Sequence, residues 1–495
     1  MKAVTPKEMA RIESLSYQKG CQEDAFMQNA GKGIAQCADS FVQEHALGEQ
    51  VLLLCGSGNN AGDAYVAGIE LLSYGYQVTA YPVVPYDKCS PLCQKYSSLF
   101  QKMGGITTGH LEFSNISILI DGLFGTGFHG EVREPFASVI KQANQSKKPI
   151  LAVDIPSGLD GETGIVKGEA IVANATVFLG LPKIGFFLND GWNHVGQLFP
   201  VDFGLPKEFI DQAKSDLKMV DLPLLKIPKI VRNRNKYQAG HVVGLGGSPG
   251  MPGAPVMSSM AALRTGSGIV HLLYPKEIGH ELSSTPLELI KIGVSYENVE
   301  EILNRLNQAD AAFIGPGLGR EESTRKLLRT LLPRLEKPCV IDADALFFLS
   351  EEEVSLPKNA ILTPHGGEMV RLLKINSRLT FDPTWLERCQ NYVDNKKVTL
   401  VLKGGPSFIL QPGKKLFVCP RGTPGLATAG SGDILTGIIA SLLSQGLSPI
   451  EAAITGVYLH ALSGEEAAKI LTPFCMNATD ILDYLPQAYR EMGLF

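Results

Sequence analysis

Short apolar runs alternate with glycine-containing loops and with segments of helical periodicity along most of the chain. Continuous apolar runs are typical of strands buried on both faces of a parallel sheet. In the first half the predicted strands are VLLLC (51–55), VTAYPVV (78–84), ISILI (116–120) and PILAV (149–153). Thr5 and Glu8 form a capping-box pattern that opens a helix of about ten residues, and a second helical segment runs from about Ala25 to Glu44. The repeated strand–loop–helix order predicts an α/β fold.

A weaker pattern separates this half from a second α/β series. Between Phe203 and Arg234 prolines interrupt the periodicity and basic residues cluster, so we place a domain boundary at about residue 225. The predicted strands beyond it lie in HVVGL (241–245), IVHLL (269–273), AAFIG (311–315), CVIDADAL (339–346), AILTPHGGEM (360–369), VTLVLKGGPSFIL (398–410) and LFVCP (416–420). With about 150 residues per domain as a guide, the sequence predicts two domains, 1–224 and 225–495.

The stretch Gly422–Gly437 runs directly into an apolar-periodic helix. Isoleucines and leucines between Ile434 and Leu443 recur on one helical face, which places Gly430-Ser431-Gly432 at a helix N-terminus. Free backbone N–H groups and the helix dipole favour an anion such as phosphate there. Asp433 has two interpretations, because an acidic residue suits the first turn of a helix and also suits a proton acceptor from a hydroxyl that attacks a phosphate.

Three predicted strands of the first half end in Asp or Asn together with glycines. Gly56, Gly58 and Ala61 satisfy a loose dinucleotide-binding pattern, but no acidic residue ends the next strand, so that match is weak. Ligands gather outside the carboxyl ends of parallel strands, and three such endings favour a ligand site over simple turns. Oxygen atoms of Asn60, Asp121 and Ser157 are among those expected at this edge, and they suit a hard cation.

Strand ends of the second half also converge, and they supply Gly317, His365, Lys403, Gly432 and Asp433. Each has a structural alternative, since a single histidine is often structural or exposed and Lys403 with two glycines is also typical of a solvated turn. Glycines that let backbone N–H groups reach a phosphate are the functional interpretation of the same loop.

Asp342 and Asp344 lie at one predicted strand end and form a candidate metal-binding pair. Residues one position apart on a strand face opposite sides of the sheet. We therefore expect one carboxylate to point at the site and the other to be structural.

Composition excludes several classes of function. The net charge of −5, with both signs mixed, gives no electrostatic footprint for nucleic acid. The nine cysteines show no CxxC pair, which fits a reducing compartment. No signal-peptide core and no apolar run of about 18 residues occur, so we expect a soluble, cytoplasmic protein without membrane partners. We also expect a homo-oligomer.

The motifs NNAGD, DGLFGTG, DIPSGLDGETG and LPKIGFF of the first half resemble the N-terminal epimerase domain of the NAD(P)H-hydrate repair enzymes. The resemblance implies a Rossmann-like three-layer αβα domain that interconverts the R and S forms of hydrated NADH and NADPH, with Asp154 as acid or base at the reacting carbon. It further implies potassium at Asn60, Asp121 and Ser157. Substrate-binding residues by the same resemblance are Asn59, Asn60, Ala61, Gly62, Asp63, Gly125, Thr126, Gly127, Phe128, His129, Gly130, Glu131 and Asp154.

The chain departs from that family pattern at three positions. Where the family usually has NNGGDG, this chain has Ala61 and Ala64 in place of the first and last glycines of the motif. Gln28 stands where the family has glutamate. A methyl group where the backbone approaches a phosphate is expected to narrow the site.

GPGLG, DADAL, TPHGGEM, KGGPS and AGSGDILTG resemble the C-terminal ADP-dependent NAD(P)H-hydrate dehydratase domain, which has the ribokinase-like αβα fold. The resemblance implies a lyase that phosphorylates the hydrate hydroxyl from ADP, giving AMP, and then expels phosphate to restore the double bond. Asp433 would accept the hydroxyl proton, and magnesium would accompany the ADP. Ala254, Gly317, His365 and Asp433 would bind the hydrate, and Lys403, Gly404, Gly405, Pro406, Ser407 and Gly432 would bind the nucleotide.

One alternative shares the same anion site. A ribokinase-like kinase of a small molecule, such as a vitamin precursor, would also use Asp433, with the first half as a non-catalytic binding module. The two resemblances span nearly the whole chain in the order of the bifunctional bacterial enzymes, and they favour a small-molecule repair enzyme that is both isomerase and lyase.

Overall fold

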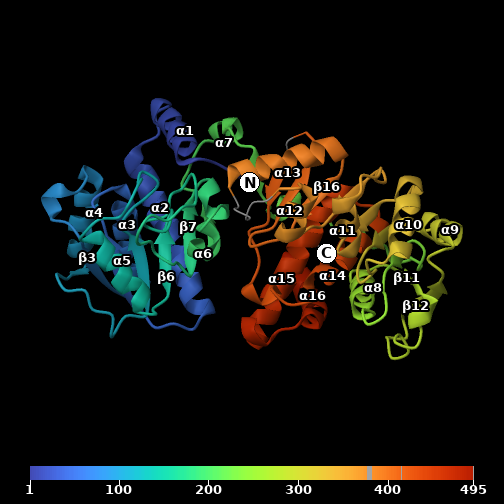
Figure 1. The fold of residues 1–495 in the computed structure, drawn as a ribbon. Helices are drawn as coiled ribbons and strands as arrows, with labels where there is room; N and C mark the ends of the chain where they lie inside the picture. Colours follow the sequence, from blue (N-terminus) through green and yellow to red (C-terminus); the bar gives the residue numbers. More distant parts are fainter. Residues whose placement is uncertain (376–381, 414, 494–495) are drawn as a thin grey trace. The chain divides into compact units, whose positions relative to one another are not determined.

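The computed structural model describes residues 1–375, 382–413 and 415–493 (Figure 1). The chain divides into two compact units, Met1–Lys218 and Met219–Phe495. We call them unit 1 and unit 2. The division lies a few residues before the boundary expected at about 225.

Unit 1 is built on a parallel sheet with the strand order β4-β3-β2-β5-β6-β7-β8. The strands are β2 (Gln50–Cys55), β3 (Gln77–Pro82), β4 (Ile106–Thr107), β5 (Ile118–Gly122), β6 (Ile150–Val153), β7 (Ala175–Leu179) and β8 (Gln197–Val201). The four strands predicted here are confirmed. From β2 the chain builds the sheet in one direction to β4 and then in the other direction from β5, so the strand order reverses between β2 and β5. Ligands of open α/β sheets bind at such a switch point.

Helices cover both faces of this sheet. They are α1 (Pro6–Gln18), α2 (Glu23–Glu44), α3 (Asn59–Ser73), α4 (Pro91–Lys102), α5 (Phe136–Gln145), α6 (Gly191–Val195) and α7 (Lys207–Gln212). Val51 and Leu53 of β2 lie in one buried cluster with α2 and α3, whereas Leu52 and Leu54 lie in a second with α5. This alternation of side chains along a strand confirms a three-layer αβα domain.

The beginning of the chain is held by local and distant contacts. Thr5 caps α1, and its side chain accepts a hydrogen bond from the N–H of Glu8 at 3.2 Å, as the capping pattern predicts. β1 (Lys2–Ala3) pairs antiparallel with β9 (Leu217–Met219) through Lys2 and Lys218 and through Ala3 and Leu217.

Unit 2 contains a mixed sheet in the order β18-β17-β16-β15-β14-β13-β10-β11-β12. The strands are β10 (His241–Leu245), β11 (Ile269–Pro275), β12 (Ile290–Val294), β13 (Ala311–Ile314), β14 (Cys339–Ile341), β15 (Ala360–Leu362), β16 (Thr399–Leu402), β17 (Phe408–Gln411) and β18 (Lys415–Val418). All neighbours from β16 to β12 are parallel, and β17 and β18 form an antiparallel hairpin. Here the order reverses between β10 and β13, which is the switch point of unit 2.

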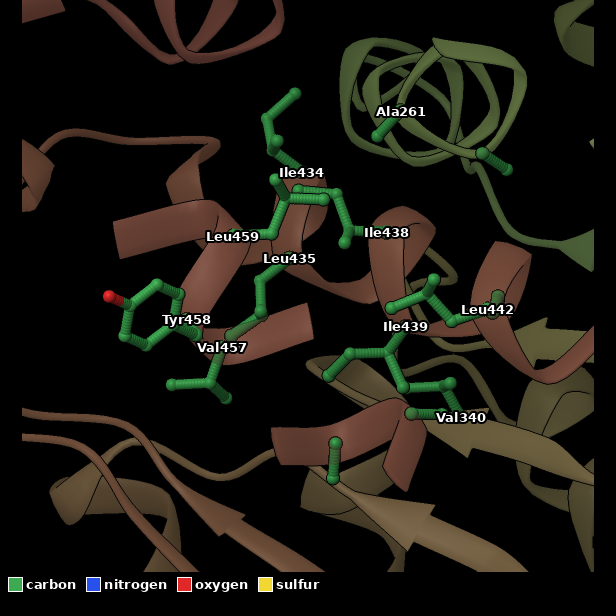
Figure 2. Packing of buried hydrophobic residues seen from close by; sticks show 14 of the residues in the cluster. Ala261, Val340, Ile434, Leu435, Ile438, Ile439, Leu442, Val457, Tyr458 and Leu459 are labelled. Atoms are coloured by element: carbon green, nitrogen blue, oxygen red, sulfur yellow. The ribbon is translucent and has the colours of Figure 1, made fainter. Parts of the chain in front are cut away.

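The helices of unit 2 are α8 (Gly253–Arg264), α9 (Val299–Asn307), α10 (Glu322–Leu331), α11 (Asp344–Glu351), α12 (Gly366–Leu372), α13 (Pro383–Lys396), α14 (Ser431–Ser444), α15 (Pro449–Cys475) and α16 (Ala478–Met492). The sequence predicts one apolar face for α14, but every residue from Ile434 to Ser444 is buried. Figure 2 shows the reason, because side chains of α14 lie among Ala261 of α8, Val340 of the sheet, and Val457 and Leu459 of α15.

One glycine allows α14 to approach α8 closely. A Cβ added to Gly437 would lie 1.9 Å from the backbone oxygen of Ser258. Only a residue without a side chain fits at this crossing, so Gly437 positions the N-terminus of α14 within the unit. Within the described part of the chain, no helix is both long and apolar enough to cross a membrane.

Candidate active sites

A cavity of about 620 Å³ lies at the switch point of unit 1. Nine of the residues predicted to bind substrate line it: Asn59, Asn60, Asp63, Gly125, Thr126, Gly127, Phe128, His129 and Asp154. Four others, Ala61, Gly62, Gly130 and Glu131, are not among its lining residues. The cavity is therefore built from the start of α3 and from the loops that follow β5 and β6, with α1 and α2 closing another side.

The alanines that replace family glycines do not narrow this cavity. Ala61 and Ala64 are fully buried in the hydrophobic cluster that lies between the sheet and α3. The Ala64 methyl occupies the space beside Gly122, where an added Cβ would come within 2.7 Å of it. Gln28 is exposed and donates to Asp24 at 3.1 Å. The expected narrowing is wrong, because the methyl groups point into the core.

Asp154 is held in a fixed position at the edge of the cavity. Its backbone is left-handed with φ of 63°, and its N–H donates to Val177 O at 2.8 Å. Its Oδ1 accepts from the N–H of Leu179 at 3.2 Å and from the ammonium group of Lys183. A non-glycine residue in this conformation is strained and is retained where the surroundings over-determine it, often at functional sites.

Lys183 was missed as a functional residue by sequence reasoning, although it belongs to the quoted motif LPKIGFF. Its side chain is fully buried, and it also donates to Leu179 O at 3.3 Å. A buried ammonium group needs a partner because isolated charge is costly away from water. Its pairing with Asp154 places a positive charge directly behind the carboxyl group at the cavity.

Three further carboxyl groups line the cavity: Glu13 of α1, Glu23 of α2 and Asp63 of α3. Burial, followed by the nearby Asp154, raises the pKa of Glu13 to about 7, while Lys183 opposes the shift. Burial, with Asp154, Glu13 and Glu23 nearby, raises the pKa of Asp63 well above its usual value. The sequence pattern did not single out Glu13 or Glu23, because neither lies at a strand end.

The three residues predicted to hold a cation are brought together around the backbone of Phe124. Ser157 Oγ donates to Asp121 Oδ1 at 2.6 Å and lies 3.3 Å from Phe124 O, and Asn60 Nδ2 donates to Phe124 O at 2.9 Å. Asp121 is fully buried, and burial raises its pKa to about 6 despite hydrogen bonds from Ser157. A buried carboxyl group among neutral oxygens is a donor set that fits a potassium ion. Across the described residues, no cluster of three or more His, Cys, Asp or Glu forms a metal site.

In unit 2 the start of α14 presents free backbone donors. Gly430 caps the helix with φ of 92°. The N–H of Ser431 donates to Thr428 O at 3.3 Å, so it is already occupied. In the described part of the chain the N–H groups of Gly432 and Asp433 have no hydrogen-bond partner. These two groups are therefore available to an anion, whereas the N–H of Ser431 is not.

Asp433 lies in the first turn of α14 beside several other charges. Burial raises its pKa to about 7, and Asp342 adds to the shift while Lys403 opposes it. A carboxyl group with a pKa near neutrality is poised to take up and release a proton. Its position in the first turn agrees with the helix-start interpretation, and its role as a proton acceptor stays a prediction.

Lys403 is held next to this helix start by other side chains. Its Nζ donates to Asp342 Oδ1 at 2.8 Å, and Thr436 Oγ1 donates to Asp342 Oδ2 at 2.8 Å. A Cβ on Gly432 would lie 3.2 Å from Lys403 Nζ. Burial lowers the pKa of Lys403, but Asp342 and Glu368 together raise it above its usual value. A permanent positive charge thus lies beside the free N–H groups.

The side chains of Asp342 and Asp344 have different partners, but the two residues do not lie on opposite faces of one strand. β14 ends at Ile341, and Asp344 begins α11. Asp344 Oδ1 accepts from Arg320 Nε at 2.9 Å, and its Oδ2 accepts from the N–H of Gly319 at 3.0 Å. Asp342 binds the lysine of the site instead. The expectation that both residues lie on one strand and face opposite sides of the sheet is wrong, because the backbone bends at Ala343 (φ of 52°) between them.

His365 combines a structural role with a position beside the site. It caps α12, and its Nδ1 accepts from the N–H of Gly367 at 3.0 Å. It forms an isolated parallel bridge with Lys403. Burial, with Lys403 next in effect, lowers the pKa of His365. A largely neutral imidazole is therefore presented next to Lys403.

The remaining predicted residues of unit 2 lie in two places. The loop of Gly404, Gly405, Pro406 and Ser407 follows β16, and Ser407 Oγ donates to Gly404 O at 3.1 Å. Ala254 lies in the first turn of α8, and Gly317 (φ of 60°) lies against the residues next to it, since an added Cβ would be 3.4 Å from Pro255 Cδ. α8 also meets the start of α14, because a Cβ on Gly430 would lie 2.7 Å from Met257 Sδ.

A buried histidine supports the helix start from within. His460 Nε2 lies 3.1 Å from Ser431 Oγ and 3.0 Å from Ser431 O. Burial lowers the pKa of His460 to about 4, so the ring is neutral at physiological pH. No local pattern in the sequence indicates this contact.

Comparisons with known proteins match both units. Residues 23–185 match the family model described as YjeF-related protein N-terminus, and residues 242–487 match the model described as NAD(P)H-hydrate dehydratase. The bifunctional NAD(P)H-hydrate repair enzyme of Moorella thermoacetica is 34% identical over 516 residues, covering 99% of this chain and 97% of the relative.

Solved structures resemble the second unit. A ribokinase-like superfamily protein from Enterococcus faecalis is 28% identical, with a TM-score of 0.50 and coverage of 56% of this chain and 97% of that one. This confirms the predicted ribokinase-like fold. An ADP/ATP-dependent NAD(P)H-hydrate dehydratase from Bacillus subtilis, co-crystallised with ATP and Mg²⁺, is 24% identical with a TM-score of 0.49 and covers 56% of this chain and 98% of its own.

Proposed function

Because the chain belongs to the family of bifunctional NAD(P)H-hydrate repair enzymes, we propose which residues carry its two activities. The protein is an NAD(P)H-hydrate epimerase and an ADP/ATP-dependent NAD(P)H-hydrate dehydratase. The assignment of each activity to a unit follows the matched residues, with epimerisation in unit 1 and dehydration in unit 2. Its substrates are hydrated NADH or NADPH and an adenine nucleotide, and ADP is the donor we propose.

In unit 1 the hydrated nicotinamide is proposed to lie in the 620 Å³ cavity with its reacting carbon at Asp154. The loop Gly125–Phe128 and the start of α3 at Asn59 and Asn60 provide backbone and amide groups for the rest of the dinucleotide. Lys183 orients the Asp154 carboxyl group by binding its Oδ1, which leaves Oδ2 to take the proton. What supports this proposal is the convergence of these groups at the switch point.

Potassium is proposed to bind at Asn60, Asp121 and Ser157. The oxygen atoms that meet there are those of the Asp121 carboxyl group, Ser157 Oγ and Phe124 O. Asn60, whose Nδ2 donates to Phe124 O, would turn its amide group to offer its side-chain oxygen. A bound cation would neutralise the buried Asp121 carboxylate and stiffen the loop that lines the cavity. Removing potassium is expected to lower epimerase activity without changing dehydration.

In unit 2 the hydroxyl oxygen of the hydrate is proposed to attack the terminal phosphorus of ADP while Asp433 takes the hydroxyl proton. The bond from that phosphorus to the bridging oxygen breaks and AMP leaves. The free N–H groups of Gly432 and Asp433 and the ammonium of Lys403 stabilise the charge on the phosphoryl oxygens. Loss of phosphate and of a proton from the adjacent carbon then restores the double bond of NADH or NADPH.

Magnesium is proposed to accompany the nucleotide. The described residues offer no three-ligand cluster, which fits an ion held mainly by phosphate oxygens with one or two carboxylates. When bound, it would neutralise part of the charge that develops on the phosphates. His365 and Lys403–Ser407 remain proposed contacts to the hydrate and the nucleotide.

The single observation that carries the dehydratase assignment is Asp433, with a pKa of about 7, at a helix start with free N–H groups and Lys403 beside it. The test is to incubate the S hydrate with ADP and follow both absorbance recovery of the reduced nicotinamide and phosphate release. Equal amounts of the two products are expected. A stable phosphorylated product would instead favour the kinase alternative, which the full-length match to bifunctional relatives already disfavours.

A further inference from the structure

Asp63 is a second buried carboxyl group in the cavity of unit 1, besides Asp154. It lies near the start of α3, lines the cavity of unit 1 and is only 8% exposed. Within the residues that the structure describes, its carboxyl group makes no hydrogen bond and no ion pair. A carboxyl group that is buried without a partner is costly unless it is kept neutral or serves a ligand.

The groups that face Asp63 are nearly all acidic. They are Asp154 from the loop after β6, Glu13 and Tyr17 from α1, and Glu23 from α2. Asp154 differs from Asp63 because the ammonium of Lys183 is bound to it. Asp154 is therefore paired with a cation and Asp63 is not. When the surroundings of two carboxyl groups differ in this way, one can act as a base and the other as an acid.

The two carboxyl groups also enter the cavity from different sides of one strand. Asp63 follows β2 and Asp154 follows β6, and β5 lies between β2 and β6 in the sheet. A planar nicotinamide ring placed between them would present one face to each group. Inversion by loss and re-addition of the hydroxyl group is helped by an acid on the face that the group leaves and by a base on the face that water enters.

We propose that Asp63 is a second catalytic residue of unit 1, which donates the proton with which the hydroxyl group leaves the hydrated nicotinamide. This inference rests on the proposed epimerase role of the cavity. Water adds to a reduced nicotinamide at the enamine carbon next to the ring nitrogen, so the hydroxyl carbon can use the nitrogen lone pair. The C–O bond breaks, the hydroxyl leaves as water with the Asp63 proton, and a C=N bond forms.

The return step inverts the carbon. A water molecule adds to the C=N carbon from the other face, its proton passes to Asp154, and the electron pair of the C=N bond returns to nitrogen. The net change is an inverted carbinol and one proton moved from Asp63 to Asp154. The opposite direction begins with the proton on Asp154, so the pair must hold one proton in either direction. Catalysis is therefore expected to fall when both groups are ionised.

The first test is Asp63→Asn in the full-length protein, which is nearly isosteric and keeps a neutral side chain in the cavity. We expect interconversion of separated R and S hydrates to fall by about 10²–10⁴-fold, while dehydration of the S hydrate and the unfolding temperature stay near the parent values. Asp87→Asn, at an exposed position in the same unit, is the matched control. Wild-type interconversion in Asp63→Asn would overturn the proposal.

Two measurements on the unmodified protein keep the test decisive even if Asp63→Asn fails to fold. In H₂¹⁸O each catalysed inversion should place labelled oxygen in the product, and catalysed inversion without label would contradict C–O cleavage. The rate should fall as rising pH removes the proton from Asp63, and a rate that rises throughout the pH range in which the protein stays folded would contradict its role as donor. If the unmodified protein shows no interconversion above the uncatalysed rate, the proposed epimerase role itself fails, which is a different result from an active Asp63→Asn variant.

Discussion

Both units place carboxyl groups and a lysine after the carboxyl ends of sheet strands, but they pair them differently. In unit 1, Lys183 binds the candidate catalytic residue Asp154 itself. In unit 2, Lys403 binds Asp342 and not the candidate catalytic residue Asp433, whose pKa is raised to about 7. The lysine is thus paired with the candidate catalytic carboxyl group in unit 1, whereas in unit 2 it is paired with a different carboxyl group.

We propose that the partner of the lysine decides the chemistry of each site. A carboxyl group bound to a buried ammonium is held in one orientation, which suits a base beside an acid in an inversion. Asp433 has carboxyl groups nearby, and the cation beside it, Lys403, is already bound to Asp342. Such a carboxyl group is easier to protonate, which suits reversible proton uptake from a hydroxyl. Four predictions test this comparison.

The largest effect is expected at the proton acceptor of unit 2. Asp433→Asn should lower dehydration by about 10²–10⁴-fold because the amide cannot accept the hydroxyl proton. ADP affinity should stay nearly unchanged, since the free N–H groups and Lys403 remain. The measurement is absorbance recovery from the S hydrate with ADP, with epimerase activity as the internal control. Turnover near the wild-type rate would remove Asp433 from the mechanism.

The lysine of unit 1 is expected to matter for stability as well as for activity. Lys183→Met should destabilise unit 1 by about 3–5 kcal/mol, since it leaves a buried carboxylate without its cation. Denaturant unfolding measures this, and Lys19→Met, at an exposed ion pair with Glu208, is the control with an expected cost of about 0–1 kcal/mol. If both substitutions lower the free energy of unfolding by the same amount, the pairing of Lys183 with Asp154 is not the feature that distinguishes unit 1.

Helix packing near the two sites should respond unequally to the same added methyl group. Gly437→Ala in α14 would meet the backbone oxygen of Ser258 at 1.9 Å and should cost about 1–3 kcal/mol. Gly62→Ala in α3 would meet the end of the flexible Met27 side chain at 2.7 Å, which can move aside. Unfolding of the two variants compares them directly, and an equal or greater cost at Gly62 would contradict the fixed position of α14.

The smallest effect is a shift of a pH profile. Asp342→Asn removes a negative charge that raises the pKa of Asp433 and frees Lys403, which lowers it, so the pKa of Asp433 should fall. The base is active when ionised, and the dehydration rate is lost as pH falls through this pKa. The acid limb should therefore move to lower pH, by about one unit or less. Asp344→Asn is the control with a smaller shift, because Asp344 contributes less to Asp433.

Much of the fold and part of each site could be predicted because their signals are local. Apolar runs located β2, β5, β6 and β10, and glycine patterns located the start of α14. Asn60, Asp121 and Ser157 were expected together because strand ends of a parallel sheet share one edge, and they meet around Phe124. By contrast, Glu13 could not be found in this way, because it lies on a helix and reaches the cavity only through packing.

The sequence by itself determined the order of the elements, the glycine loops and the presence of Asp433 in the first turn of a helix, since each depends on neighbouring residues. Only the tertiary structure decided which charges meet. Lys183 binds a carboxylate 29 positions away, Lys403 binds one 61 positions away, and Thr436 reaches the same Asp342 over 94 positions. Protonation depends on the loss of water around a group and on its distance to other charges, and both quantities exist only once the chain has folded.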